Sequence, residues 1–599
     1  MKLSKYIIIS LTALALLLNS CNDEDFLERY PLDEISSAIY FKSASDFELY
    51  ANQFYPNVFY NNDNGSTNEG WNAGMYDGDL NSDNMIKIGE PDSRLAGYNS
   101  VPSSGGTWEW DYSQIRAVNY GISGIDKLEG DPSEANQYIG ELYFFRAFYY
   151  FDLVKTFGNV TWIDKPLNPE SDELFAPRDS RTLIIDHVLA DLDKAADLMN
   201  SGKNMDGTRL SKEVAHAFKS RVALYEGTWE KYHAGDIFKG DTDGTNYLNQ
   251  AVDAAEKVIN SGIYSIYSTG NPDQDYFDLF VQRDYAGWDE VMLWKKYDID
   301  QSFVSHHHVA SRYAYQKGPT RGLAASYLSL DGQPRSLSPT FNESLCDTTA
   351  TYESRHLDPR FKQTFASKDA IWGVRQVDGQ TIVTRWYDPD EGLHSKMRCV
   401  PAIIGAAEGR GNTPTGYIRR KGFSPDMSVW EDWSDEDFGF IFIRYAEVLL
   451  NYAEAKAELG SLSQSDIDIS INRLRERVNM PGLNLSAIPN DPNWDFPDLS
   501  PIINEVRRER RIELAFEGFR LDDILRWAAA DDLIVGKRFK GVLYKNGNPN
   551  IYIDENGYVD RLYEELPSGY GFVLGRDYLE PLPNRELTLN ENLTQNPGW

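Results

Sequence analysis

Apolar residues recur at helical spacing over much of this chain, while two long stretches lack any sustained period. A period of about 3.6 residues places apolar side chains on one face of a helix. The pattern predicts helices over residues 45–59, 133–157, 181–199, 211–233, 247–260, 440–459, 465–478 and 501–527. The helix over residues 133–157 is apolar on nearly every side, which favours a buried position.

Short turns that contain glycine, aspartate or serine join the predicted helices between residues 181 and 260. They give antiparallel helix pairs of about 35 residues, which is the length of a tetratricopeptide unit. The strict signature of that repeat is absent from the sequence. The prediction of tetratricopeptide-like pairs therefore rests on helix length and spacing.

The two stretches without a period are residues 61–112 and 263–439. Loops of such length are usually functional or disordered. Within the second stretch, Glu290 to Tyr297 has the pattern of a strand. The rest provides a helical scaffold over about 36–60, 113–262 and 440–528. We therefore predict a mainly α fold over residues 36–599: one compact domain with a tetratricopeptide-like scaffold, large irregular insertions and short β elements.

The beginning of the chain has the pattern of a bacterial secretory signal. Two lysines precede an apolar run from Ile7 to Leu18, which is shorter than the roughly 20 residues that span a bilayer. Cys21 follows, and its thiol can be acylated, although Asn19 departs from the alanine, serine or threonine usual at that place. We predict a signal peptide over residues 1–20 and an acylated Cys21 with a tether over residues 21–35. An ordinary signal peptide with a chance cysteine is the alternative.

The net charge of -33 excludes a general nucleic-acid binder, because attraction to phosphates needs clustered lysine and arginine. If Cys21 is acylated, Cys346 and Cys399 are the remaining cysteines. A disulfide between them is possible, but their spacing does not establish it. The sequence has no CxxC pair and no zinc-type spacing of cysteine and histidine, so we predict no structural zinc site. It has no dinucleotide-binding or phosphate-loop motif either, and we predict no cofactor.

Charged residues of the later predicted helices could suggest acid–base catalysis: Glu447, Glu454, Arg510, Arg511, Glu513, Glu517 and Arg520. Several stand three or four residues apart, the spacing of helical ion pairs, so we predict structural pairing. His306 to His308 are adjacent on a predicted loop, and adjacent loop histidines rarely converge on one ion. Asp241 to Gly244 is similar to a calcium loop, but Lys239 and Gln250 occupy its first and last ligand positions, which excludes it.

Five segments together resemble one known family. They are FLERYPLDEI (26–35), ELYFFRAFYYFDLVKTFGNV (141–160), IRYAEVLLNYAEAKAELG (443–460), ERRIELAFEGFRLDDILRW (509–527) and YLEPLPNRELTLNENLTQNPGW (578–599). Each resembles its counterpart in SusD/RagB-type nutrient-binding lipoproteins, and their order and distances agree. The resemblance spans essentially the whole mature chain.

The resemblance implies four tetratricopeptide-like helix pairs that support an irregular ligand-binding face. It also implies a lipid anchor in the outer membrane, exposure at the cell surface, and a SusC-like TonB-dependent transporter as partner. Members of the family capture oligosaccharides, or in some branches peptides, for import and carry out no chemistry. The acidic run Asn22 to Asp25 resembles the signal that sends such lipoproteins outward. A surface glycosidase and an adaptor that binds only proteins are the alternatives from other classes.

The irregular stretches hold the predicted ligand contacts. Sugar recognition needs aromatic rings for the apolar face of a pyranose, and carboxylates or amides for its hydroxyl groups. The first stretch offers Trp71, Tyr76, Asp79, Asn81, Asp83 and Asn84. The resemblance implies that both stretches line the ligand site, and the second holds Trp288, Tyr297, Arg312, Tyr313 and Tyr315. Packing within the loops is the alternative for each of these residues.

Overall fold

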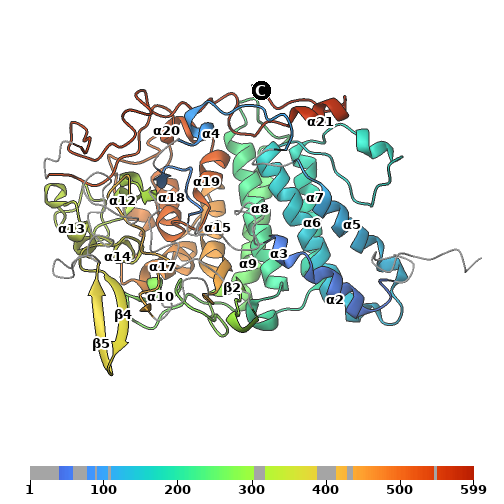
Figure 1. Cartoon of the computed structure of the whole chain (residues 1–599), viewed down its shortest axis with the longest axis horizontal. Helices are drawn as coiled ribbons and strands as arrows, with labels where there is room; N and C mark the ends of the chain where they lie inside the picture. The colour runs from blue at the N-terminus through green and yellow to red at the C-terminus, as the bar shows by residue number, and fades with distance from the viewer. Residues whose placement is uncertain are drawn as a thin grey trace, which may run out of the picture.

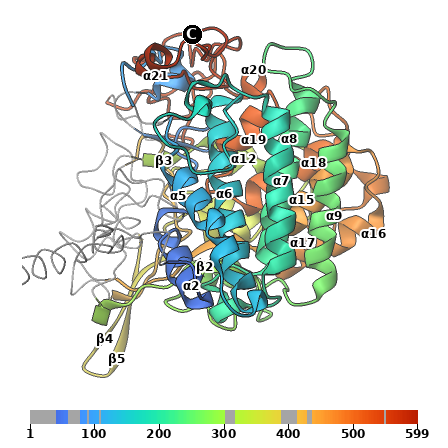
Figure 2. The ribbon, with the colours of Figure 1, turned by 90° about the vertical axis from the view of Figure 1, so that its right-hand side faces the viewer.

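The computed structural model describes residues 40–58, 77–87, 91–105, 110–301, 317–386, 413–427, 436–545 and 550–599. Long helices run side by side through the centre of the molecule (Figure 1, Figure 2). They are α6 (Asn136–Phe157), α7 (Arg181–Leu198), α8 (Lys212–Tyr232), α9 (Thr245–Ser261) and α15 (Tyr445–Glu458). Each packs against the next in this order, and α5 (Ser113–Ser123) packs on α6.

Local sequence explains where these helices begin and end. The hydroxyls of Ser180 and Ser211 cap α7 and α8 by accepting hydrogen bonds from backbone N–H groups of the first turn. Helix α9 lies between Gly244 (φ +78°) and Gly262 (φ +66°), and both glycines have the left-handed backbone conformation that favours glycine. The predicted boundaries of α7, α8 and α9 therefore agree with the structure to within two residues.

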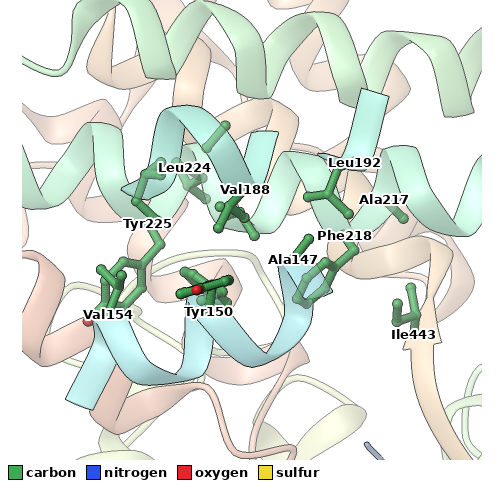
Figure 3. Packing of buried hydrophobic residues seen from close by; sticks show 14 of the residues in the cluster. Ala147, Tyr150, Val154, Val188, Leu192, Ala217, Phe218, Leu224, Tyr225 and Ile443 are labelled. Atoms are coloured by element: carbon green, nitrogen blue, oxygen red, sulfur yellow. The ribbon is translucent and has the colours of Figure 1, made fainter. Parts of the chain in front are cut away.

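The main hydrophobic core lies between these helices, as Figure 3 shows for α6, α7 and α8. It includes Ala147, Tyr150 and Val154 from α6, Val188 and Leu192 from α7, and Phe218 from α8. Helix α6 is buried along most of its length, which confirms the prediction from its apolar pattern. Full burial of one large apolar side chain contributes about 1.5–3 kcal/mol, so this core makes the helices a stable base for the rest of the chain.

The helix predicted over residues 440–459 is wrong at its start. Phe440–Arg444 forms strand β6, and the helix begins only at Tyr445. Strand β6 pairs antiparallel with β2 (Val291–Lys295), which lies within the strand predicted from Glu290 to Tyr297. Aromatic and β-branched residues such as Phe440 and Ile441 favour a strand when a partner strand is present.

Three other predicted helices are interrupted. The helix predicted over residues 465–478 breaks at Ser470 into α16 (Gln464–Ile469) and α17 (Ile471–Arg477). The helix predicted over residues 45–59 is divided into α2 (Ala44–Asn52) and α3 (Tyr55–Val58). The one over residues 501–527 divides into α18 (Pro501–Glu513) and α19 (Arg520–Arg526). Between α18 and α19, Phe516 and Gly518 have φ values of +70° and +85°, which an α-helix does not allow.

The described parts of the two irregular stretches contain only short elements. Strand β1 (Met85–Lys87) pairs antiparallel with β3 (Lys317–Pro319), and β4 (Ile371–Val377) forms a hairpin with β5 (Gln380–Arg385) that projects from the body (Figure 1). Among the described residues, the α-helices not yet named are α4 (Ser93–Ala96), α10 (Asp275–Asp278), α12 (Arg321–Ser326), α13 (Thr351–His356) and α14 (Arg360–Thr364) in these stretches, and α20 (Ala530–Leu533) and α21 (Asn584–Leu589) after them. The prediction of a mainly helical fold with short β elements is confirmed.

Candidate ligand-binding site

The two irregular stretches meet at the small sheet formed by β1 and β3. Its register pairs Met85 with Pro319 and Lys87 with Lys317. Lys317 Nζ also donates to Asp77 Oδ2 over 2.6 Å, and the two side chains are only 10% and 11% exposed. Segments that lie 240 positions apart in the sequence are therefore held in contact.

The segment before β1 lies on the turn between α18 and α19. The Asp79 carboxylate is buried and accepts from the backbone N–H groups of Phe516 (2.8 Å) and Gly518 (3.2 Å). Gly78 approaches this turn so closely that a Cβ on it would stand 2.6 Å from Gly518 Cα. Burial raises the pKa of Asp79 and outweighs these hydrogen bonds, which lower it. The left-handed turn that interrupts the predicted helix thus presents N–H groups to Asp79.

Asp83 joins the same segment to both helices. Its Oδ1 accepts from Arg520 Nε over 2.6 Å, and its Oδ2 accepts from Arg511 Nη2 over 2.8 Å. Arg511 Nε also donates to Asn84 Oδ1 over 2.8 Å. Burial alone would raise the pKa of Asp83, but the two guanidinium groups outweigh it and hold this pKa below its ordinary value. One buried carboxylate and two cations therefore anchor the loop to the scaffold.

Three predicted contacts of the first stretch are thus brought together, but their side chains are buried. Asn84 completes the group by donating from Nδ2 to Asp79 Oδ2 over 2.8 Å, next to Asp83. In the structure these side chains hold the loop in place. Asn81, by contrast, is exposed and has a φ of +68°, a conformation that asparagine tolerates. Ligand contact by these four residues stays a prediction.

The two described predictions of the second stretch lie elsewhere in the core. The half-buried Trp288 stacks on Tyr267 with ring centroids 4.2 Å apart. Tyr297 is buried, and Lys295 Nζ lies 4.4 Å from its ring centroid. Both tyrosines and Trp288 belong to the hydrophobic cluster around β2, whereas Met85 of β1 belongs to another cluster. Neither Trp288 nor Tyr297 therefore belongs to the cluster that contains Met85 of β1.

The remaining predictions fall outside the described residues. They are Trp71, Tyr76, Arg312, Tyr313 and Tyr315 among the ligand contacts, together with Cys21, Cys399 and His306 to His308. In the sequence, Tyr76 directly precedes Asp77, and Tyr315 stands two positions before Lys317. The ion pair of Asp77 and Lys317 is therefore a fixed point close in sequence to two predicted contacts.

Sequence reasoning missed two cations at this place, Lys317 and Arg419. Arg419 Nη2 lies 3.5 Å from Asp77 Oδ1, whereas Lys317 contacts the other carboxylate oxygen, Oδ2. No local pattern marks either residue, because the partner acid is far away in the sequence. The one available signal was Asp77 itself, which stands among the aromatic and acidic residues that end at Asp79.

The predicted ion pairing of the helical charges is confirmed, but most partners lie on other elements. Glu513 accepts from Arg477 Nη2 over 2.6 Å and from Arg444 Nη1 over 2.8 Å. Burial alone would raise the pKa of Glu513, but Arg477, Arg444 and Arg360 hold it well below its ordinary value. Other pairs are Arg221 with Glu447, Arg526 with Glu454, Arg510 with Asp523, and Lys421 with Glu517. Carboxylates neutralised in this way suit a structural role.

Over the described ranges, no group of three or more histidine, cysteine, aspartate or glutamate side chains could hold a metal ion. Nor does any helix in this part of the chain have both the length and the apolar character needed to cross a bilayer.

Cys346 is buried, and its Sγ accepts from Arg335 Nη2 over 3.3 Å. Burial raises the pKa of this thiol to about 12.

Comparisons with known proteins define the class to which this scaffold belongs. Residues 233–599 match the SusD family, and residues 25–224 match a family described as starch-binding and associating with the outer membrane. The chain therefore belongs to the SusD family, as the five resembling segments indicated.

Individual relatives agree with this assignment. SusD-like protein P38 of Formosa agariphila is 25% identical over 538 residues, which cover 88% of this chain and 92% of the relative. A solved SusD-like carbohydrate-binding protein of Bacteroides fragilis superposes with a TM-score of 0.68 at 22% identity, over 92% of this chain and 99% of its own. A solved laminarin-binding SusD-like protein superposes with a TM-score of 0.52 at 19% identity, and the match covers 93% of this chain and 100% of that protein. At such identities the two structures show the shared fold alone.

Proposed function

We propose that this protein is a cell-surface lipoprotein that captures glycan chains and passes them to a SusC-like TonB-dependent transporter, without chemistry of its own. Membership of the SusD family and the match to a starch-binding, outer-membrane-associating family support this proposal. The names of the similar structures, which refer to carbohydrate and laminarin binding, favour the same ligand class. Acylation of Cys21 supplies the anchor in this proposal.

The observation that carries the proposal is the joined base of the two irregular stretches. Strand pairing of β1 with β3 and the ion pair of Asp77 with Lys317 hold a segment from each stretch together. Asp83 then ties this base to α18 and α19. A base that is rigid before binding reduces the entropy lost when loops close on a ligand.

The chemistry of the predicted contacts favours weak, reversible binding. One aromatic platform adds about 0.5–1.5 kcal/mol beyond area burial, and one hydrogen bond adds about 1 kcal/mol. Two or three rings with several hydrogen bonds give dissociation constants on the order of micromolar to millimolar. Such affinity suits a protein that must release its cargo to a transporter.

Native electrophoresis through gels that contain starch, laminarin or other plant, host and microbial polysaccharides tests glycan capture. The sample is the chain from Asn22 onward, produced without its anchor. We expect one polysaccharide to retard it. Retardation by none of them would contradict glycan capture and favour peptides, the other ligand class known in the family.

The same gels test the predicted contacts of the first stretch. Replacing Trp71 and Tyr76 together by alanine should raise the dissociation constant at least about fivefold, because two stacking rings are lost. Phe175→Ala is the matched control, since it removes an exposed ring from the short 3-10 helix between α6 and α7. Unchanged affinity in the double variant would remove both residues from the site.

The non-catalytic character has its own test. The soluble chain is incubated with the polysaccharide that retards it, and reducing ends are measured over several hours. We expect none above the level of the polysaccharide alone. Release of reducing ends would favour a surface glycosidase.

A further inference from the structure

Two tyrosines of the C-terminal segment form an exposed stacked pair. The rings of Tyr552 and Tyr563 are nearly parallel, with an interplanar angle of 13° and centroids 3.7 Å apart. The two residues are nevertheless 47% and 41% exposed. In a stack, each ring covers one face of the other. The exposed area must therefore come from the outer faces and the edges of the rings.

A short hairpin holds Tyr552 in position. The backbone carbonyl of Tyr552 accepts a hydrogen bond from Asp560 N over 3.0 Å, and Asp554 N donates to Tyr558 O over 2.9 Å. The turn of this hairpin is closed by Gly557, whose φ of +87° favours glycine. The ring of Tyr552 is thus presented by ordered backbone, so little further conformational entropy is lost when a ligand stacks on it.

One cation, Arg538, is held over the ring of Tyr563. Arg538 Nε donates to the buried Asp560 Oδ2 over 2.9 Å, and its guanidinium carbon lies 5.7 Å from the Tyr563 ring centroid. Lys540 pairs with the same carboxylate. Arg538 Nη1 also donates to Pro567 O over 2.8 Å. The Arg538 side chain remains about one quarter exposed, so its guanidinium can donate to a ligand that lies next to Tyr563.

This tyrosine pair is connected to the base of the candidate site. Arg321, which begins α12 directly after β3, donates from its backbone N to Lys540 O over 2.8 Å. Its guanidinium carbon lies 5.1 Å from the ring centroid of Tyr558, in the same hairpin as Tyr552. Arg321, two positions after the end of β3, therefore contacts both the hairpin and the segment that carries Lys540.

We propose that Tyr552 and Tyr563 form a ring-stacking platform for a pyranose of the captured glycan, with Arg538 as a hydrogen-bond donor to its hydroxyls. This inference rests on the proposed glycan capture and adds a contact point outside the two irregular stretches. The apolar face of a pyranose matches the area of one aromatic ring. A docked protein, by contrast, needs about 800 Å² on each partner, and the tyrosine pair with the exposed Ile553 offers far less.

Ring removal tests the platform. The soluble chain with Tyr552→Ala and Tyr563→Ala is titrated in native gels with starch, laminarin and the other polysaccharides, beside the wild type and Phe175→Ala. We expect the dissociation constant for the retarding polysaccharide to rise about tenfold in the double alanine variant and to stay unchanged in the control. A second variant with phenylalanine at both positions keeps the rings and should stay within about twofold of the wild type.

Each result decides between the proposals. Equal affinity of the wild type and the double alanine variant, with the wild type retarded, would overturn the platform and leave glycan capture standing. An equal loss in the phenylalanine and alanine variants would also overturn ring stacking, since only the hydroxyls would then matter. No retardation of the wild type would reject both proposals. Unchanged glycan affinity combined with lost copurification of a protein partner would assign the tyrosine pair to a protein contact instead.

Discussion

The anchor at Asp83 gives a quantitative prediction about stability. Asp83→Asn keeps the shape of the side chain but removes the charge that faces Arg511 and Arg520. Leaving a buried charge without its partner costs about 3–5 kcal/mol. Arg511 retains a second acid, because its Nη1 donates to Asp495 Oδ2 over 3.0 Å. We therefore expect the lower end of this range, a loss of about 3 kcal/mol in the free energy of unfolding.

Urea unfolding of the soluble chain, followed by tryptophan fluorescence, measures this loss. Asp495→Asn is the matched control, because it makes the same chemical change in a carboxylate that is 42% exposed and contacts Arg511. Its cost should stay below about 1 kcal/mol, the usual value for exposed pairs. Equal losses in the two variants would refute the reasoning, since burial would then make no difference.

The pH dependence of the stability difference between wild type and Asp83→Asn tests whether the loss is electrostatic. The pKa of Asp83 in the folded chain lies below its ordinary value, so ionised Asp83 stabilises the fold above the unfolded pKa of about 3.9. This contribution is lost as the pH falls through the folded-state pKa. The difference in unfolding free energy between wild type and Asp83→Asn should be complete at pH 7 and smaller at pH 3. A difference independent of pH would contradict an electrostatic anchor.

Two further predictions concern single sites. Gly78→Ala should lower the free energy of unfolding by about 1–3 kcal/mol, because the new Cβ would lie 2.6 Å from the Gly518 backbone. Thermal unfolding measures this loss against the control Gly235→Ala, where a new Cβ would have no neighbour within 4 Å. Equal unfolding midpoints of the two variants would show that the turn moves to accommodate the Cβ. In the soluble chain from Asn22 onward that carries Cys399→Ser, Cys346 is the remaining cysteine. It should react slowly with a thiol reagent when folded and rapidly in denaturant, because burial raises its thiol pKa to about 12. Rapid reaction of the folded chain would argue against a closed site around Cys346.

The scaffold was predictable wherever local sequence decides the structure. Helix α7 begins at Arg181 as predicted, because Ser180 caps it and its apolar face has a clear period. The break between α18 and α19 was not predictable, because its cause lies elsewhere. The turn at Phe516 is held by the carboxylate of Asp79, which is 437 positions earlier in the sequence.

The candidate site was predictable as a region but not as a set of side chains. A loop rich in acids, amides and aromatics fits sugar recognition, and it also fits a loop that needs buried anchors. Only the structure shows that Asp79 and Asp83 face N–H groups and guanidinium groups, while Asn81 faces solvent. The composition of a loop does not say which of its polar side chains have partners in a distant helix. This is why Lys317, which pairs with Asp77, carried no signal in the sequence.

The contact of Asp83 with Arg520 has a consequence for the order in which the molecule is assembled. Its two residues are 437 positions apart, so the loop that contains Asp83 cannot take its final form until the segment around Arg520 is in place. Distant contacts form slowly, because the entropy of closing a long loop is lost before the contact is gained. Helices α6 to α9, by contrast, pack on their neighbours in the sequence. A chain that stops before α19 should therefore retain the packing of α6 to α9 but lack the Arg520 contact that fixes the loop around Asp83.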